Sequence, residues 1–88
     1  MTRSEVEEAY NRHKLRFPQS RLRINFRVAD EFLATHGGSD ADVRNAIQES
    51  ILDVYLMEME AEVLIFEKGV NWKDAGKRVR ASRRHGGK

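Results

Sequence analysis

The C-terminal end of this sequence concentrates basic side chains that can contact phosphate. Seven of the sixteen residues from 73 to 88 are Lys or Arg, and a single acid, Asp74, opposes them. Cations at this density favour nucleic acid, because each phosphate that they neutralise releases condensed counterions. We therefore predict a phosphate-binding segment that ends in a basic tail over about residues 77–88. The residues expected to contact nucleic acid here are Lys73, Lys77, Arg78, Arg80, Arg83 and Arg84.

A second basic segment, residues 21–28, alternates polar and apolar side chains without interruption. In a β-strand its apolar residues would share one face, and Arg23, Asn25 and Arg27 would lie on the other. Arg can bond guanine and Asn can bond adenine through two hydrogen bonds each, so such a face could read base edges. The pattern favours a strand. A helix from about residue 20 to residue 36 is the alternative.

The net charge of +2 conceals a strong separation of charge along the chain. Residues 1–29 carry seven Lys or Arg against three Glu, residues 30–67 carry one against ten acids, and residues 68–88 carry eight against one. Two basic ends therefore flank an acidic middle. The ends are either exposed to a polyanion or docked on acidic groups, whether those of this protein or of an acidic protein partner. We expect a nucleic-acid partner, with DNA favoured over RNA.

Signatures of catalysis are missing from the sequence. It contains no Gly-rich phosphate loop, no nucleophile elbow and no His-Glu-x-x-His pattern. Its three histidines, His13, His36 and His85, fall in three different segments, and it has no cysteine to ligate zinc or form a disulfide. We therefore expect a binding protein rather than an enzyme, with no catalytic residues, no metal and no cofactor.

The length and hydropathy of the chain limit its organisation and location. Eighty-eight residues are expected to form one small domain. No apolar run approaches the roughly 18 residues that a membrane span needs, and the first residues lack the apolar core of a signal peptide. The expected location is the cytoplasm, in association with the nucleoid if the partner is chromosomal DNA.

Residues that start and stop helices divide the first half of the chain. Ser4 followed by Glu7 has the form of a capping box and predicts a helix over about 4–16. Pro18 must end that helix, because the residue before a proline is pushed out of the helical region. A short helix that ends at about residue 36 is expected before the next pair of glycines.

The second half is predicted to hold one long helix and one short helix. Ser39 is expected to cap the long helix, which runs over about 39–68 and ends before Gly69. Asn71 is expected to cap the last helix, over about 71–84. Within that helix Trp72, Ala75 and Val79 form a short apolar edge.

The long helix is apolar on two faces. One seam repeats at helical spacing from Val43 to Ile65, and a second runs from Leu52 to Phe66. A domain this small has little other surface with which to cover both faces, so we predict a homodimer. The expected dimer interface consists of Leu52, Tyr55, Leu56, Met59, Val63 and Phe66.

An acidic stripe lies between the two apolar seams. Residues 57–63 also alternate, so an acidic strand there could pair with the basic strand 21–28. Met, Glu and Ala are strong helix formers, and a helix is the favoured structure. The stripe consists of Glu49, Asp53, Glu60 and Glu67.

The segment Ile-Asn-Phe-Arg-Val at 24–28, followed by Glu31-Phe32, resembles the strand and helix start of ribbon-helix-helix repressors of the Arc type. The pattern Ser39-x-x-Asp42-Val43 is similar to the start of the second helix in that family. The resemblance covers residues 21–50. The sequence departs from the family in its first helix, which would be about two turns shorter than the family requires.

This resemblance implies a fold and a role for the basic segment. In ribbon-helix-helix repressors, strands from two subunits pair and their polar residues read base edges in the major groove. The resemblance therefore implies that Arg23, Asn25 and Arg27 face DNA. It also implies that the first amides of the helix after Ser39 bind phosphate.

Two fainter resemblances also concern DNA. Residues 73–81, Lys-Asp-Ala-Gly-Lys-Arg-Val-Arg-Ala, are similar to basic repeats of bacterial histone H1-like proteins, which coat DNA without reading its sequence. The short, long, short order of helices is also similar to the histone fold. The connections between these helices are shorter than those of that fold.

Together these patterns predict a mainly helical, dimeric protein with three to four helices around a long central helix. One short β-strand at 21–28 is the expected intersubunit ribbon. The predicted function is nucleic-acid binding, as a small regulator or an architectural protein. The alternative is a helical protein-interaction module, such as a small regulatory or assembly factor, that uses the apolar and acidic faces of the long helix.

Overall fold

The computed structural model describes the backbone of residues 1–86 and the side chains of residues 1–83. Four helices form the fold: α1 (Arg3–Arg16), α2 (Phe26–His36), α3 (Ala41–Lys68) and α4 (Trp72–Gly86). The described residues contain no β-strand. The prediction of a mainly helical protein around one long helix is therefore confirmed.

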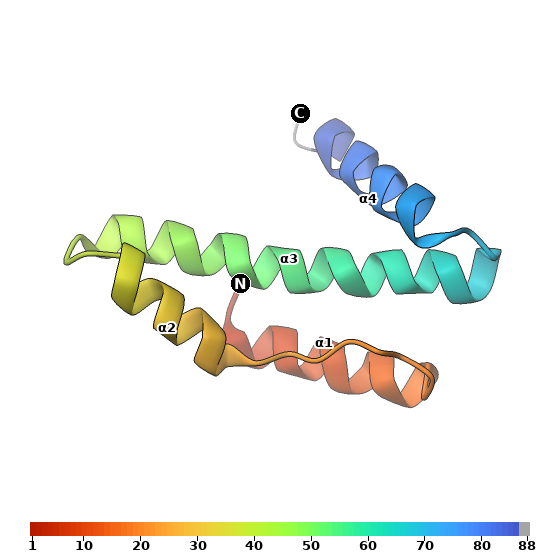
Figure 1. Ribbon diagram of the computed structural model, residues 1–88, viewed down its shortest axis with the longest axis horizontal. Helices are drawn as coiled ribbons and strands as arrows, with labels where there is room; N and C mark the ends of the chain where they lie inside the picture. The colour runs from red at the N-terminus through yellow and green to blue at the C-terminus, as the bar shows by residue number, and fades with distance from the viewer. Residues whose placement is uncertain (87–88) are drawn as a thin grey trace.

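The long helix α3 lies in the middle of the molecule, and the other helices pack against it (Figure 1). α1, α2 and the connection between them cover one side of α3, and α4 folds back along the opposite side. The molecule is flat, with principal extents of 44 × 30 × 19 Å. Each side of α3 is therefore covered by a different part of the same chain.

Neighbouring polar residues, and not the expected serines, cap the first and third helices. Thr2 accepts a hydrogen bond from the amide nitrogen of Glu5 at 3.2 Å, so α1 begins before the capping box predicted at Ser4. Asp40 rather than Ser39 caps α3 and accepts from two amides of its first turn at 2.9 and 3.3 Å. In both places a second capping residue lies one or two positions away, and sequence alone does not decide between such neighbours.

The end of α3 and the start of α4 follow the predicted pattern. Gly69 ends α3 in the left-handed region, at φ 67°, where its amide hydrogen bonds the carbonyl of Ile65 at 3.1 Å. The side-chain oxygen of Asn71 accepts from the amide of Asp74 at 2.8 Å, as an N-cap does. This tight connection turns α4 back against α3.

Residues 21–28 form no strand within this single chain, and the predicted intersubunit ribbon stays a prediction. Residues 21–25 have no regular secondary structure, and helix α2 begins at Phe26. Asn25 caps that helix by accepting from the amide of Arg27 at 3.0 Å, and its own carbonyl accepts from the hydroxyl of Tyr55 at 3.2 Å. The alternation still describes burial, since Leu22 packs on the core while its neighbours are exposed. A period-two pattern reports which side chains face inward, and it does not require a hydrogen-bonded partner strand.

Helices of the same chain pack on both apolar faces of α3, and the predicted homodimer stays a prediction. Leu52 and Met59 are buried together with Val6 of α1. The ring of Phe66 lies 5.3 Å from that of Phe17. The residues predicted to face a second subunit, Leu52, Tyr55, Leu56, Met59, Val63 and Phe66, are all buried or half-buried in the single chain.

The opposite face of α3 receives α4. Ala61 of α3 and Ala75 and Val79 of α4 form a second buried cluster. The prediction of a dimer assumed that one short chain could not cover two faces. The structure covers them because α1 and α4 each place buried apolar side chains on α3, such as Val6 and Val79.

A buried carboxylate holds the connection between α1 and α2 against α3. Glu62 is 4% exposed, and its Oε1 hydrogen bonds His13 Nε2 at 2.7 Å and accepts from the hydroxyl of Ser20. Its Oε2 accepts from the amide of Arg21 at 3.1 Å. Three donors from one short stretch of chain therefore meet on a single side chain of the long helix.

The electrostatics of Glu62 reflect these bonds. Burial alone would raise the pKa of Glu62, but the hydrogen bonds from Ser20, His13 and the Arg21 amide, with the attraction of His13, lower the pKa of that carboxyl. Ser20 donates to the carboxylate and not to the imidazole, so the three side chains do not form the relay of a Ser-His-acid triad. Their arrangement is that of a structural anchor.

Candidate nucleic-acid interface

Three of the predicted phosphate-binding residues share one face of α4. Lys73, Lys77 and Arg80 follow each other at helical spacings of four and three residues, so they form a stripe along one side of the helix. All three are exposed. Ala75 and Val79, on roughly the opposite side of the helix, are buried against α3 and fix the orientation of the helix. We call Lys73, Lys77 and Arg80 the basic stripe.

The remaining predicted cations of α4 are placed differently. Arg78 is exposed on the other flank of the buried edge. The guanidinium of Arg83 binds Asp53 and, at 2.9 Å, Glu60 of α3. The Nε of Arg83 is buried without a partner among the described residues. Arg83 therefore anchors α4 to the long helix, while the side chain of Arg84 lies outside the described residues.

The second predicted element, around residues 21–28, does not join the basic stripe. It lies with α1 on one side of α3, whereas α4 lies on the other (Figure 1). Arg23 is exposed and donates to the carbonyl of Leu22 at 3.3 Å. Arg27 is exposed and lies 3.4 Å from Glu31 of its own helix. Asn25 is occupied in capping α2, so it does not form a row of base-reading side chains with these arginines.

Cations outside the basic stripe neutralise the acidic stripe of α3. Arg16 of α1 binds Glu67, and the N-terminal amine lies 3.5 Å from Glu49. Asp53 and Glu60 are the partners of Arg83. Within residues 1–83, none of the ion pairs involves Lys73, Lys77 or Arg80. The four acids of the acidic stripe are thus paired without Lys73, Lys77 or Arg80, which stay exposed to solvent.

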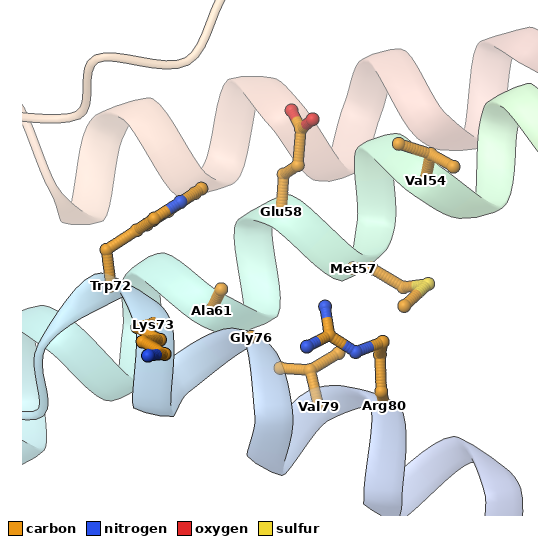
Figure 2. Close-up of a pocket in the computed structure, with 9 residues that line it drawn as sticks. All are labelled: Val54, Met57, Glu58, Ala61, Trp72, Lys73, Gly76, Val79 and Arg80. Carbon is orange, nitrogen blue, oxygen red and sulfur yellow. The ribbon is translucent and has the colours of Figure 1, made fainter.

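A groove between α3 and α4 runs beside the basic stripe (Figure 2). Its volume is about 290 Å³. Ala61 and Gly76 lie between the two helices, Trp72 lies at one end of the groove, and Met57 and Arg80 lie at the other. The complete lining is Val54, Met57, Glu58, Ala61, Trp72, Lys73, Gly76, Val79 and Arg80.

Trp72 is the functional candidate that the sequence did not reveal. Its spacing with Ala75 and Val79 is that of a buried helical edge, and those two residues are indeed buried. Trp72 itself is 57% exposed. It also lines a second hollow together with Arg21, from the connection between α1 and α2. No local signal distinguishes it from a core residue, because its exposure depends on where the first turn of α4 meets α3.

Glu58 forms the acidic part of the groove. It is half-buried on the wall contributed by α3, one helical turn before the buried Glu62. Burial raises the pKa of Glu58, and the nearby negative charge of Glu62 raises it further. The groove therefore has an apolar floor, a basic side along α4 and one weakened acid on α3.

Metal binding and membrane spanning can both be assessed in the described part of the chain. Within it, no group of three or more His, Cys, Asp or Glu side chains is placed to hold a metal ion. None of its helices is both long enough and apolar enough to cross a membrane. The chain matches no family model, and no curated protein or solved structure was found to be similar to it.

Proposed function

We propose that this protein binds nucleic acid through the exposed face of α4. The observation that supports the proposal is the basic stripe, a set of cations left without carboxylate partners in residues 1–83 while other cations pair with the acidic stripe. A cation that served only to stabilise the fold would be expected to bind a carboxylate of the acidic stripe, as Arg83 does. A row of exposed cations on a rigid helix suits a regularly charged polymer.

The chemistry of the stripe fits phosphate contacts that do not depend on base sequence. Each residue of a helix advances about 1.5 Å along the axis, so the three cations recur about every 5 Å. Their long side chains can adjust over a few ångströms to successive phosphates. Arg78, exposed on the other flank of α4, adds a further cation to the same helix. Binding of this kind gains free energy from counterion release and weakens steeply with salt.

The interaction-module alternative has less support. It requires the apolar faces of α3 to be available to a partner, whereas α1 covers one and α4 covers the other. Its acidic face is also engaged, since Arg16 binds Glu67 and Arg83 binds Asp53 and Glu60. Nucleic-acid binding instead uses the exposed face of α4.

A charge-matched pair of triple variants tests the proposal. The stripe variant carries Lys73→Gln, Lys77→Gln and Arg80→Gln. The control variant carries Arg12→Gln, Arg23→Gln and Arg27→Gln, which remove the same charge from exposed positions outside α4. Binding of a short fluorescent DNA is measured by anisotropy over a range of salt concentrations.

The proposal predicts that the control variant keeps its affinity for DNA and that the stripe variant loses affinity. The wild-type protein and the control should bind DNA at low salt and lose affinity as salt rises. The stripe variant should bind more weakly, with a log–log salt slope that is smaller by about 2–3, because three phosphate contacts are lost. Absence of binding by the wild type at low salt, or equal loss in both variants, would refute the proposal.

A further inference from the structure

Trp72 is far more exposed than Ala75 and Val79, the buried apolar residues of the same helix. Trp is the largest apolar side chain, and this ring is more than half exposed although the buried edge of its own helix lies next to it. The apolar surface continues into the groove through Val54, which is 49% exposed. An open aromatic face of this kind is a surface on which a planar group can stack.

The charges around the ring identify what kind of planar group fits. Lys73 follows Trp72 in the chain and lines the same groove, and Arg80 lines its far end. Arg21 lines the second hollow that Trp72 shares. A flat apolar ring bordered by cations matches a ligand in which flat rings alternate with anions.

We propose that the groove between α3 and α4 binds single-stranded nucleic acid, with one base stacked on Trp72 and the neighbouring phosphates on the basic stripe. This inference rests on the proposed function and makes it more specific. It names an unpaired strand as the ligand and the groove as the site at which a base is held. It adds Trp72 to the residues that contact the ligand.

A single strand suits this site better than a duplex. The bases of a duplex are paired and stacked on one another, so their faces are closed to a side chain unless the duplex opens. Unpaired bases offer their faces, and each base stacked on an aromatic ring contributes strongly without regard to sequence. The basic stripe alone would serve either ligand, and Trp72 is the feature that distinguishes them.

Glu58 gives the strand an orientation in the groove. Its carboxylate lies on the α3 wall, and Lys73 and Arg80 lie on the α4 wall. Phosphates are therefore attracted to α4 and repelled from α3, which leaves the base to lie over the apolar residues between them. The carboxylate of Glu58 can accept a hydrogen bond from the amino group of a base in that position.

The fluorescence of Trp72 provides a direct readout, because it is the only tryptophan in the sequence. The full chain is titrated at low salt with a strand of about 12 nucleotides, the same strand as a duplex, and an abasic strand of equal charge. The intact strand should quench Trp72 and bind most tightly. The duplex and the abasic strand should bind more weakly, through phosphates alone, with little quenching.

Matched single variants then separate stacking from folding. Trp72→Ala should lower affinity for the intact strand by about 5- to 150-fold, the range for loss of one stacked base. It should leave affinity for the abasic strand nearly unchanged. Leu15→Ala is the control, since Leu15 is an apolar side chain that is 83% exposed on α1. That control should alter neither affinity.

The outcomes distinguish the two proposals. Equal binding of intact and abasic strands without quenching would overturn the stacking site, while the salt dependence could still support phosphate binding by α4. No binding of any strand or duplex would overturn both. Quenching of the same size by poly-glutamate of matched charge would show an acidic peptide groove instead and refute this inference. DNA and RNA versions of the strand show which sugar the site prefers.

Discussion

Replacing Glu62 with methionine should be among the most destabilising single changes in this protein. Met keeps the length of the side chain and the helical propensity of the position, but it removes both carboxylate oxygens. Those oxygens accept from His13 Nε2 at 2.7 Å, from the Ser20 hydroxyl and from the Arg21 amide at 3.1 Å. The change therefore separates the connection between α1 and α2 from its attachment on α3.

The expected magnitude follows from the donors that lose their acceptor. His13 is 7% exposed and Ser20 is 6% exposed, so water cannot readily replace Glu62 as their partner. A buried polar group left without a hydrogen bond costs about 1–3 kcal/mol, and two such groups, His13 and Ser20, lose their acceptor here. We expect Glu62→Met to lower the free energy of unfolding by about 2–6 kcal/mol.

Urea unfolding followed by circular dichroism measures this effect. Glu67→Met is the matched control, because Glu67 lies on the same helix in a surface ion pair with Arg16 and should cost less than about 1 kcal/mol. Glu62→Gln should fall between the two, since the amide keeps one oxygen acceptor but loses the charge. If Glu62→Met and Glu67→Met unfold at the same urea concentration, the buried carboxylate does not stabilise the fold as reasoned.

The same carboxylate gives the stability a defined pH dependence. The pKa of Glu62 is lowered in the folded protein from its ordinary value of 4.5. A lowered pKa means that the contribution of Glu62 to stability is complete above that ordinary value and is lost as the pH falls through the folded pKa. The wild-type protein should therefore lose stability on acidification below about pH 4.5. Glu62→Met should lose less over the same interval.

Three further changes test the packing around α4. Gly69→Ala should lower stability by about 1 kcal/mol in urea unfolding, because Gly69 has φ 67°, and a Gly69→Asn variant should lose less. Equal stability of Gly69→Ala and the wild type would contradict the left-handed cap. Gly76→Ala should raise stability by about 0.5–1 kcal/mol, since an added Cβ would lie 3.5 Å from Arg80 Nη1 at ordinary contact distance. Gly76→Ala should also narrow the groove and so weaken the binding of single strands. A loss of stability in this variant would instead show that the packing of α3 and α4 requires a glycine at position 76. Arg83→Met should cost about 1–2 kcal/mol, because this half-buried side chain joins two carboxylates, and a double-mutant cycle with Glu60→Gln should show coupling. Additive effects in that cycle would mean that the ion pair does not anchor α4.

The sequence was sufficient where neighbouring residues decide the outcome. The long helix, its end at Gly69 and the cap at Asn71 depend on local spacing and backbone preference, and the structure agrees with all three. The exposure of Lys73 and Lys77 also follows from the polar face of an amphipathic helix. The caps at Thr2 and Asp40 were missed because a second residue one or two positions away could also have served.

Other features depend on contacts between distant parts of the chain, and only the tertiary structure decided them. Sequence showed that α3 is apolar on two faces, but not that α1 and α4 of the same chain would cover them. It showed a cluster of cations at the C-terminal end, but not that Arg83 would bind the long helix while Arg80 stayed exposed. It placed Trp72 on an apolar edge with Ala75 and Val79, but did not show that Trp72 would be exposed.

The physical reason is the range of the interactions. Helical periodicity, caps and glycine turns act over a few residues, so their consequences can be read along the chain. Which face is covered, and which cation meets a carboxylate, depends on how helices tens of residues apart cross each other. The basic character of α4 was therefore set by its sequence, whereas the open groove beside Trp72 was set by the packing of α4 on α3.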